Sequence, residues 1–271
     1  MPDLQKFIHD IKALHIQGAK QIAIESLKFL KLYSKEKGFG KDFDKAMNQL
    51  EGARPTAVVL HNCLEILRKD KSLATMTKLI SQLNSATEKI AERGSREIKN
   101  GSVIMTHCHS GEALSVIERA WKSGKKISVI ATETSPREQG IITAKELAAA
   151  GIPVTLITDA AEGFFMPEVD MVILGSDGMR RQGNLNKIGS YPLALLARQH
   201  KKPYYVVGST FKLDRRKKYA IEERSTSEVY PDLKGVKIRN PSFDLCPWRF
   251  VYRIITEKGI FTPGNIVKML K

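Results

Sequence analysis

Two residues of this sequence, Cys108 and Asp177, are of types that together could move a proton. Cys108 lies in the turn Thr-His-Cys-His-Ser-Gly-Glu at 106–112, directly after a short β-favouring run. Asp177 lies between small residues after a second apolar run. A thiolate can act as a base, and a partly desolvated carboxylic acid can donate a proton. If the two lie at neighbouring strand ends, they could pass a proton along the carbon chain of a sugar.

Each of these residues also has a simpler interpretation. Free cysteine is among the most buried residue types, so Cys108 could serve packing alone. An aspartate in a small-residue turn often bonds the backbone. The surroundings of Cys108 favour chemistry, because a small-residue turn that enters a helix leaves backbone N–H groups available to phosphate. We expect the same field to lower the pKa of the thiol.

The sequence predicts neither a metal site nor a cofactor. His107 and His109 flank Cys108, but side chains alternate in an extended backbone, so the three would not converge on one ion. The cysteines at 63, 108 and 246 are far apart and lack CxxC spacing, which argues against a disulfide framework. No GxGxxG or Walker A motif is present, so no dinucleotide or nucleoside triphosphate is predicted.

The elements that must position these residues follow two patterns. Helical periodicity dominates the first hundred residues: one period from Ile11 to Leu30, then helices near 42–51, from Pro55 to Leu67 and from 73 to 98. Beyond Gly101, short apolar strands at 102–106, 127–131, 153–157, 170–174 and 203–207 alternate with helical patterns at 112–122, 140–150 and 189–200. We therefore predict an α/β protein, with an N-terminal helical domain (1–100) and a doubly wound parallel sheet (101–271).

Polar, glycine-rich loops follow each of the five predicted strands, whereas the loops at the opposite edge look like plain connections. Because ligands of parallel α/β sheets bind at the carboxyl ends of the strands, this asymmetry predicts the active-site edge.

The charge of the chain is its one unusual bulk property. It carries 44 Lys and Arg against 29 Asp and Glu, a net charge of +15. Such a surplus favours polyanions, either nucleic acid or phosphorylated metabolites, but no nucleic-acid recognition motif accompanies it. The sequence shows no apolar run long enough for a membrane span and no signal-peptide core, so we expect a cytoplasmic protein without membrane contact.

Taken together, these loops resemble those of the family that joins the alpha, beta and delta subunits of eukaryotic translation initiation factor 2B to two sugar-phosphate isomerases. The isomerases are methylthioribose-1-phosphate isomerase and archaeal ribose-1,5-bisphosphate isomerase. The resemblance extends from Gly18-Ala19 through Asn240–Asp244 to Thr256–Gly259. It implies an N-terminal helical domain, a Rossmann-like C-terminal domain, and a homodimer that can assemble into a hexamer, a trimer of dimers.

The resemblance also implies roles for individual residues. The isomerases have catalytic residues at the positions of Cys108 and Asp177, which the initiation-factor subunits generally lack. The substrate-binding residues that it implies are Gln17, Gly18, Ala19, Lys20, Arg54, Ser110, Gly111, Glu112, Arg137, Gln139, Asn186, Lys187 and Lys212.

Two loops depart from the isomerase pattern. Gln17 stands where the isomerases have arginine, which removes a charge-assisted phosphate contact of about 1.5–3 kcal/mol. Ser135 stands where the isomerases usually have arginine, and the sequence Glu-Thr-Ser-Pro is closer to the initiation-factor branch. Lys20 or Arg137 could supply the missing charge.

The leading hypothesis is an isomerase that converts ribose 1,5-bisphosphate to ribulose 1,5-bisphosphate through a cis-enediol-type intermediate, with Asp177 as acid and Cys108 as base. Methylthioribose-1-phosphate isomerase is one alternative, although the chain is short for that branch. The other is an initiation-factor-2B-like regulatory subunit that senses a nucleotide or sugar phosphate and contacts initiation factor 2.

Overall fold

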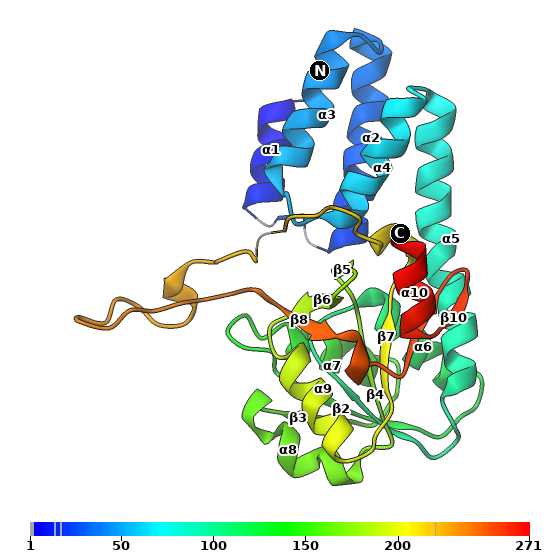
Figure 1. Ribbon diagram of the computed structural model, residues 1–271, viewed down its shortest axis with the longest axis vertical. Helices are drawn as coiled ribbons and strands as arrows, with labels where there is room; N and C mark the ends of the chain where they lie inside the picture. The colour runs from blue at the N-terminus through cyan, green and yellow to red at the C-terminus, as the bar shows by residue number, and fades with distance from the viewer. Residues whose placement is uncertain (1–2, 14, 17, 220) are drawn as a thin grey trace. The chain divides into compact units, whose positions relative to one another are not determined.

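The computed structural model describes residues 3–13, 15–16, 18–219 and 221–271 (Figure 1). Its contacts divide the chain into two units, Met1–Ala86 and Thr87–Lys271. The division falls inside helix α5 (Leu73–Glu97), because Ile90 and Ile98 join the core of the second unit. The sequence pattern placed the domain boundary after residue 100.

The first unit is helical. It contains α1 (Leu4–Lys12), α2 (Ala19–Lys37), α3 (Lys41–Ala53), α4 (Val58–Lys69) and the first part of α5. Helix α2 packs against α3 and α4, and α1 packs against α3. The predicted single period from Ile11 to Leu30 is wrong: it spans two helices, because Gly18 adopts a φ of 81°, which an α-helix does not contain.

The second unit is built on a seven-stranded sheet in the order β10-β9-β7-β4-β1-β2-β3. Its strands are β1 (Val103–Thr106), β2 (Ser128–Thr132), β3 (Val154–Ile157), β4 (Met171–Leu174), β7 (Tyr204–Val207), β9 (Arg253–Thr256) and β10 (Gly259–Phe261). All neighbours pair in parallel except β9 with β10. The five predicted strands match β1, β2, β3, β4 and β7 to within one residue, which confirms the predicted fold class.

Helices cover both faces of this sheet. Alternate strand residues belong to two cores, so that Ile104 and Ile173 face one side while Met105 and Val172 face the other. The end of α5, α6 (Gly111–Lys122) and α7 (Gln139–Ala149) contribute to the first core. The second core contains side chains of α9 (Ser190–Gln199) and α10 (Pro263–Met269) and of the segment with α8 (Glu162–Phe165) and the 3-10 helix η2 (Met166–Glu168).

A second, antiparallel sheet was not predicted. It has three strands, β5 (Gly178–Met179), β6 (Gly183–Lys187) and β8 (Phe243–Pro247), in that order. The sequence of β6, Gly-Asn-Leu-Asn-Lys, has one apolar residue and so lacks the signal of a buried strand. The strand is buried nonetheless, and it ends at Asn186 and Lys187.

The remaining elements are short. The 3-10 helices η1 (Asp159–Ala161), η3 (Thr210–Lys212), η4 (Thr226–Glu228) and η5 (Trp248–Phe250) lie in the loops of the second unit. None of the helices in the described part of the chain combines the length and the apolar composition that a bilayer crossing requires.

Candidate active site

The strand order brings Cys108 and Asp177 to one point of the sheet edge. Strands β1 and β4 are neighbours, and the chain leaves β1 toward β2 on one side and β4 toward β7 on the other. Doubly wound proteins bind ligands outside the carboxyl ends of the strands at such a switch point. Cys108 follows β1 and Asp177 follows β4, so both candidate residues lie at the switch point.

Cys108 has an unusual backbone. Its φ is 66°, in the left-handed region that residues with a side chain seldom adopt. Its N–H donates to the hydroxyl of Thr134 at 2.7 Å, and its carbonyl accepts from the hydroxyl of Thr143 at 2.8 Å. The thiol Sγ lies 3.7 Å from Oε1 of Gln139, the first residue of α7.

The predicted low pKa of the Cys108 thiol is wrong. Burial raises the pKa to about 12, and the carboxylate of Asp177 adds to the increase. The charge of Lys187 acts in the opposite direction but does not compensate. In the free protein at neutral pH the thiol is therefore protonated, because burial and a neighbouring anion both oppose the thiolate.

His107 and His109 serve the turn rather than the thiol. Nε2 of the buried His107 lies 2.8 Å from the carbonyl of Ile188, which can only accept, so Nε2 is the donor and Nδ1 accepts from Thr132 at 2.6 Å in the neutral ring. Burial lowers the pKa of His107, which favours this neutral form. Nδ1 of His109 lies 3.1 Å from the hydroxyl of Thr143. An extended backbone was expected at residues 107–109. The positive φ of Cys108 shows that the backbone is not extended there.

One group of metal-ligand types does occur behind this turn: His107, Asp159 and Glu162 bring their ligand atoms within 4.8 Å of one another. Most of these atoms already have partners. Both oxygens of Asp159 accept backbone N–H groups, from Thr134 at 2.8 Å and Ser135 at 2.7 Å. The unpartnered buried atom is Oε1 of Glu162, whose pKa burial raises to about 8. These residues therefore support the neighbouring backbone through hydrogen bonds, and the carboxyl of Glu162 is neutral at pH 7.

The N-terminus of α6 lies beside the same turn. Ser110 caps the helix by accepting from the N–H of Ala113 at 3.4 Å, and Gly111 is its first residue. The turn also packs tightly against the β4 loop: a Cβ at Gly175 would lie 2.4 Å from Oγ of Ser110. A glycine is therefore required at position 175. Because it has no side chain, the loops of Cys108 and Asp177 can approach closely.

Lys187 reaches the candidate pair from the second sheet. Its side chain is buried, and burial lowers its pKa, while the charges of Cys108 and Asp177 raise it. Asn186 is also buried, and its amide donates to Ser190 at 2.9 Å. The structure thus brings Cys108, Asp177 and Lys187 within electrostatic range of one another.

Two predicted binding residues pair with each other. Lys212 and Glu112 form a buried ion pair. The other oxygen of Glu112 accepts the N–H of Ser209 at 3.1 Å. The charge of Lys212 is therefore balanced within the protein, which the sequence did not indicate.

Arg137, in the loop between β2 and α7, forms an ion pair with Glu228 of η4 at 3.4 Å. Glu228 also pairs with Arg224 at 2.6 Å, and these bonds lower its pKa to about 2. Arg224 and Glu228 both act on the pKa of Lys187. Neither Arg224 nor Glu228 was predicted from the sequence, because both lie in a long, largely irregular segment without a motif.

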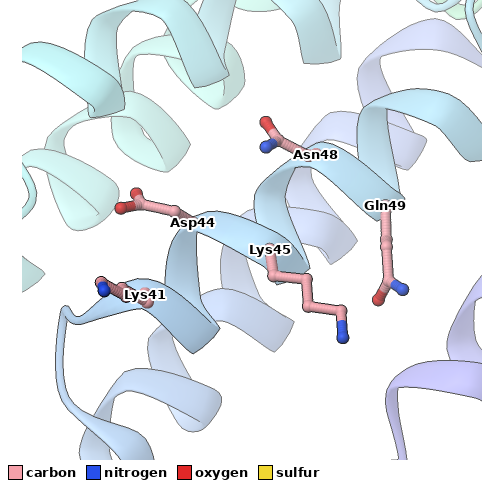
Figure 2. A pocket seen from close by; sticks show the side chains of 5 residues that line it. All are labelled: Lys41, Asp44, Lys45, Asn48 and Gln49. Carbon is pink, nitrogen blue, oxygen red and sulfur yellow. The ribbon is translucent and has the colours of Figure 1, made fainter.

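The other predicted residues lie elsewhere. Gln17 is outside the described residues. Gly18 caps the N-terminus of α2, Ala19 and Lys20 are its first residues, and Arg54 caps the C-terminus of α3, all within the helical unit. The same unit has an open depression on α3, lined by Lys41, Asp44, Lys45, Asn48 and Gln49 (Figure 2). It contains none of the predicted site residues.

Fold and site together define a doubly wound α/β protein with a thiol and a carboxylate at its switch point. Residues 15–263 match the Initiation factor 2 subunit family, and the chain belongs to that family. It is 39% identical to ribose 1,5-bisphosphate isomerase of Archaeoglobus fulgidus, over 97% of this chain and 91% of that protein. It is 38% identical to methylthioribose-1-phosphate isomerase of Acetivibrio thermocellus, over 93% of this chain and 83% of that protein.

A solved structure shows the same fold. The translation initiation factor eIF-2B of Pyrococcus horikoshii OT3 aligns with a TM-score of 0.88 and 29% identity, over 97% of this chain and 98% of that one.

Proposed function

We propose that this protein is an aldose–ketose isomerase that converts ribose 1,5-bisphosphate to ribulose 1,5-bisphosphate. The observation that carries the proposal is the position of Cys108 and Asp177 at the carboxyl ends of adjacent strands, β1 and β4. Five archaeal relatives with this name are 34–39% identical over nearly the whole chain, which supports the same assignment.

The substrate dictates what the two residues must do. The phosphate on the C1 oxygen prevents spontaneous opening of the ring. An acid must therefore protonate the ring oxygen while the bond between C1 and the ring oxygen breaks. Asp177 supplies that proton, and the thiolate of Cys108 removes the proton from C2. The electrons of the C2–H bond form a C1–C2 double bond, which gives an enol that keeps its phosphate on C1.

The second half of the reaction returns Asp177 and Cys108 to their starting protonation states. The hydroxyl proton on C2 returns to Asp177 as the C2 carbonyl forms, and Cys108 delivers its proton to C1. Both phosphates stay on the substrate, no redox cofactor takes part, and the protein ends in its starting state.

The high pKa of the thiol fits this scheme if the two groups share one proton. In the free protein the proton is on Cys108, because burial and the Asp177 carboxylate both favour the thiol. Transfer of that proton to Asp177 creates the acid and the base in one step without a change in net charge. It also removes the anion that disfavours the thiolate.

The phosphate groups require cations and backbone N–H groups. In the second unit, Lys187 and the α6 N-terminus at Ser110, Gly111 and Glu112 are the candidates. None of the ion pairs among the described residues involves Lys187, whereas Lys212 pairs with Glu112. Asn186, Gln139 and Arg137 are proposed to bind substrate hydroxyls or phosphate. In the helical unit, we propose substrate binding by Gln17, Gly18, Ala19, Lys20 and Arg54.

Methylthioribose 1-phosphate, which carries a single phosphate, is the alternative substrate, and relatives named for it also match nearly the whole chain. A substrate competition tests the choice. We expect kcat/KM for ribose 1,5-bisphosphate to exceed that for methylthioribose 1-phosphate by at least about 100-fold, because an unused phosphate site forfeits charge-assisted bonds. The reverse order would overturn the substrate assignment.

A regulatory subunit is the second candidate function, and the similarity to the Pyrococcus eIF-2B structure favours it. It predicts capture of initiation factor 2 by the purified protein and no turnover of either sugar phosphate. We also propose a homodimer that can assemble into a hexamer and a cytoplasmic location, with sedimentation and cell fractionation as the respective tests.

A further inference from the structure

The backbone of Cys108 needs a restraint. Of the described residues other than glycine, four have a positive φ: Cys108, Thr134, Glu138 and Lys201. Three of these lie in the turn after β1 and in the loop after β2, which are neighbouring strands. Residues with a side chain keep such conformations only where the surroundings enforce them.

Two buried threonines hold the peptide groups of Cys108 from opposite sides. The hydroxyl of Thr134 accepts its N–H at 2.7 Å, and the hydroxyl of Thr143 donates to its carbonyl at 2.8 Å. Both threonines are fully buried, so water cannot replace either bond. Thr134 belongs to the loop after β2, and Thr143 belongs to α7.

Thr134 is itself held, from the next strand along. Asp159, directly after β3, accepts the N–H groups of Thr134 at 2.8 Å and Ser135 at 2.7 Å. The hydrogen bonds therefore run from the β3 loop through the β2 loop to the β1 turn, across three adjacent strand ends. The His107 ring, fixed between Thr132 and the Ile188 carbonyl, secures the residue that precedes Cys108.

We propose that Thr134 and Asp159 are positioning residues, which hold Cys108 in its left-handed conformation and thereby keep its thiol in line with the C2 proton of the substrate. The proposal rests on the proposed function in its last step only. The hydrogen bonds fix the backbone of Cys108 whatever the thiol does, so its reactivity reports the restraint independently of isomerase turnover.

The hydroxyl of Thr134 can be removed with almost no change in side-chain shape. Thr134→Val lacks the acceptor, and Thr134→Ser retains it. Thr155→Val, at an exposed position of β3, is the control for the same chemical change. We expect Thr134→Val to lower kcat by about 10–100-fold, since small displacements of a reacting group cost this much. KM should change by less than about threefold, and Thr134→Ser and Thr155→Val should remain near wild type.

The second measurement is the rate of alkylation of Cys108 by iodoacetamide, followed by mass spectrometry of its peptide from pH 7 to 10. Thr134→Val should shift this profile, and Thr134→Ser should not. Asp159→Asn, which retains one acceptor oxygen, should show the same direction of change in kcat, and it tests the proposal if Thr134→Val does not fold.

The outcomes separate the two hypotheses. If the wild type turns over no sugar phosphate but Thr134→Val still shifts the alkylation profile relative to wild type, the restraint is supported and the isomerase is rejected. Wild-type kcat and an unshifted profile in folded Thr134→Val would overturn the positioning role. Equal losses in Thr134→Val and Thr134→Ser would also overturn it, because packing rather than the hydroxyl would then be responsible.

Discussion

The carboxylate of Asp177 raises the pKa of the Cys108 thiol, although the two residues come from loops after different strands. The parallel pairing of β1 with β4 makes this interaction possible, since it places the carboxyl ends of both strands side by side. A thiol beside a carboxylate is harder to ionise, and the proposed mechanism depends on this interaction.

The coupling predicts opposite effects of two substitutions on thiol reactivity. Asp177→Asn removes an anion that raises the pKa of Cys108, so alkylation of Cys108 at pH 8–9 should become several-fold faster while turnover is lost. Lys187→Met removes a cation that lowers this pKa, so alkylation should become slower. Mass spectrometry of the Cys108 peptide measures the alkylation rates. Equal rates in the wild type, Asp177→Asn and Lys187→Met would contradict the predicted effects of both charges.

The buried pair of Glu112 and Lys212 predicts a stability change that depends on both partners. Glu112→Gln leaves the buried ammonium of Lys212 without its counter-charge, which should reduce the free energy of unfolding by about 3–5 kcal/mol. Combining Glu112→Gln with Lys212→Met should recover most of this loss, because no uncompensated charge is then buried. Urea unfolding of the two variants checks the prediction. A double variant less stable than the single one would refute it.

Glu162 should make the stability of the protein depend on pH. Its pKa is about 8 in the folded protein against an ordinary value of 4.5, so the folded state binds more protons between these pH values. Its contribution to stability therefore falls as pH rises from about 4.5 to 8. Glu162→Gln should be more stable than wild type at pH 9 and similar to it at pH 4. Thermal unfolding of both proteins at pH 4 and pH 9 tests this prediction. The same stability difference between Glu162→Gln and wild type at both pH values would contradict it.

Local sequence specified five of the seven strands of the main sheet, because four- or five-residue apolar runs flanked by polar loops have few other interpretations. Strands β9 and β10 were not predicted. The edge of the sheet that carries Cys108 and Asp177 followed from the loops after the strands. The pKa of Cys108 did not follow, since its direction depends on burial and on Asp177, which only the folded chain brings near. The pairing of Glu112 with Lys212 and the bond from Cys108 to Thr134 also join residues distant in sequence. Strand β6 was missed because its residues are mostly polar, although the fold buries them.

If Cys108 is the base of an isomerase, its replacement by serine must abolish turnover. The alpha anomer of ribose 1,5-bisphosphate is supplied to the wild type and to the variant, and ribulose 1,5-bisphosphate is followed, with circular dichroism to verify that both are folded. We predict turnover by the wild type and a loss of at least about 100–10,000-fold in kcat for Cys108→Ser. A folded Cys108→Ser variant with wild-type turnover would contradict the account.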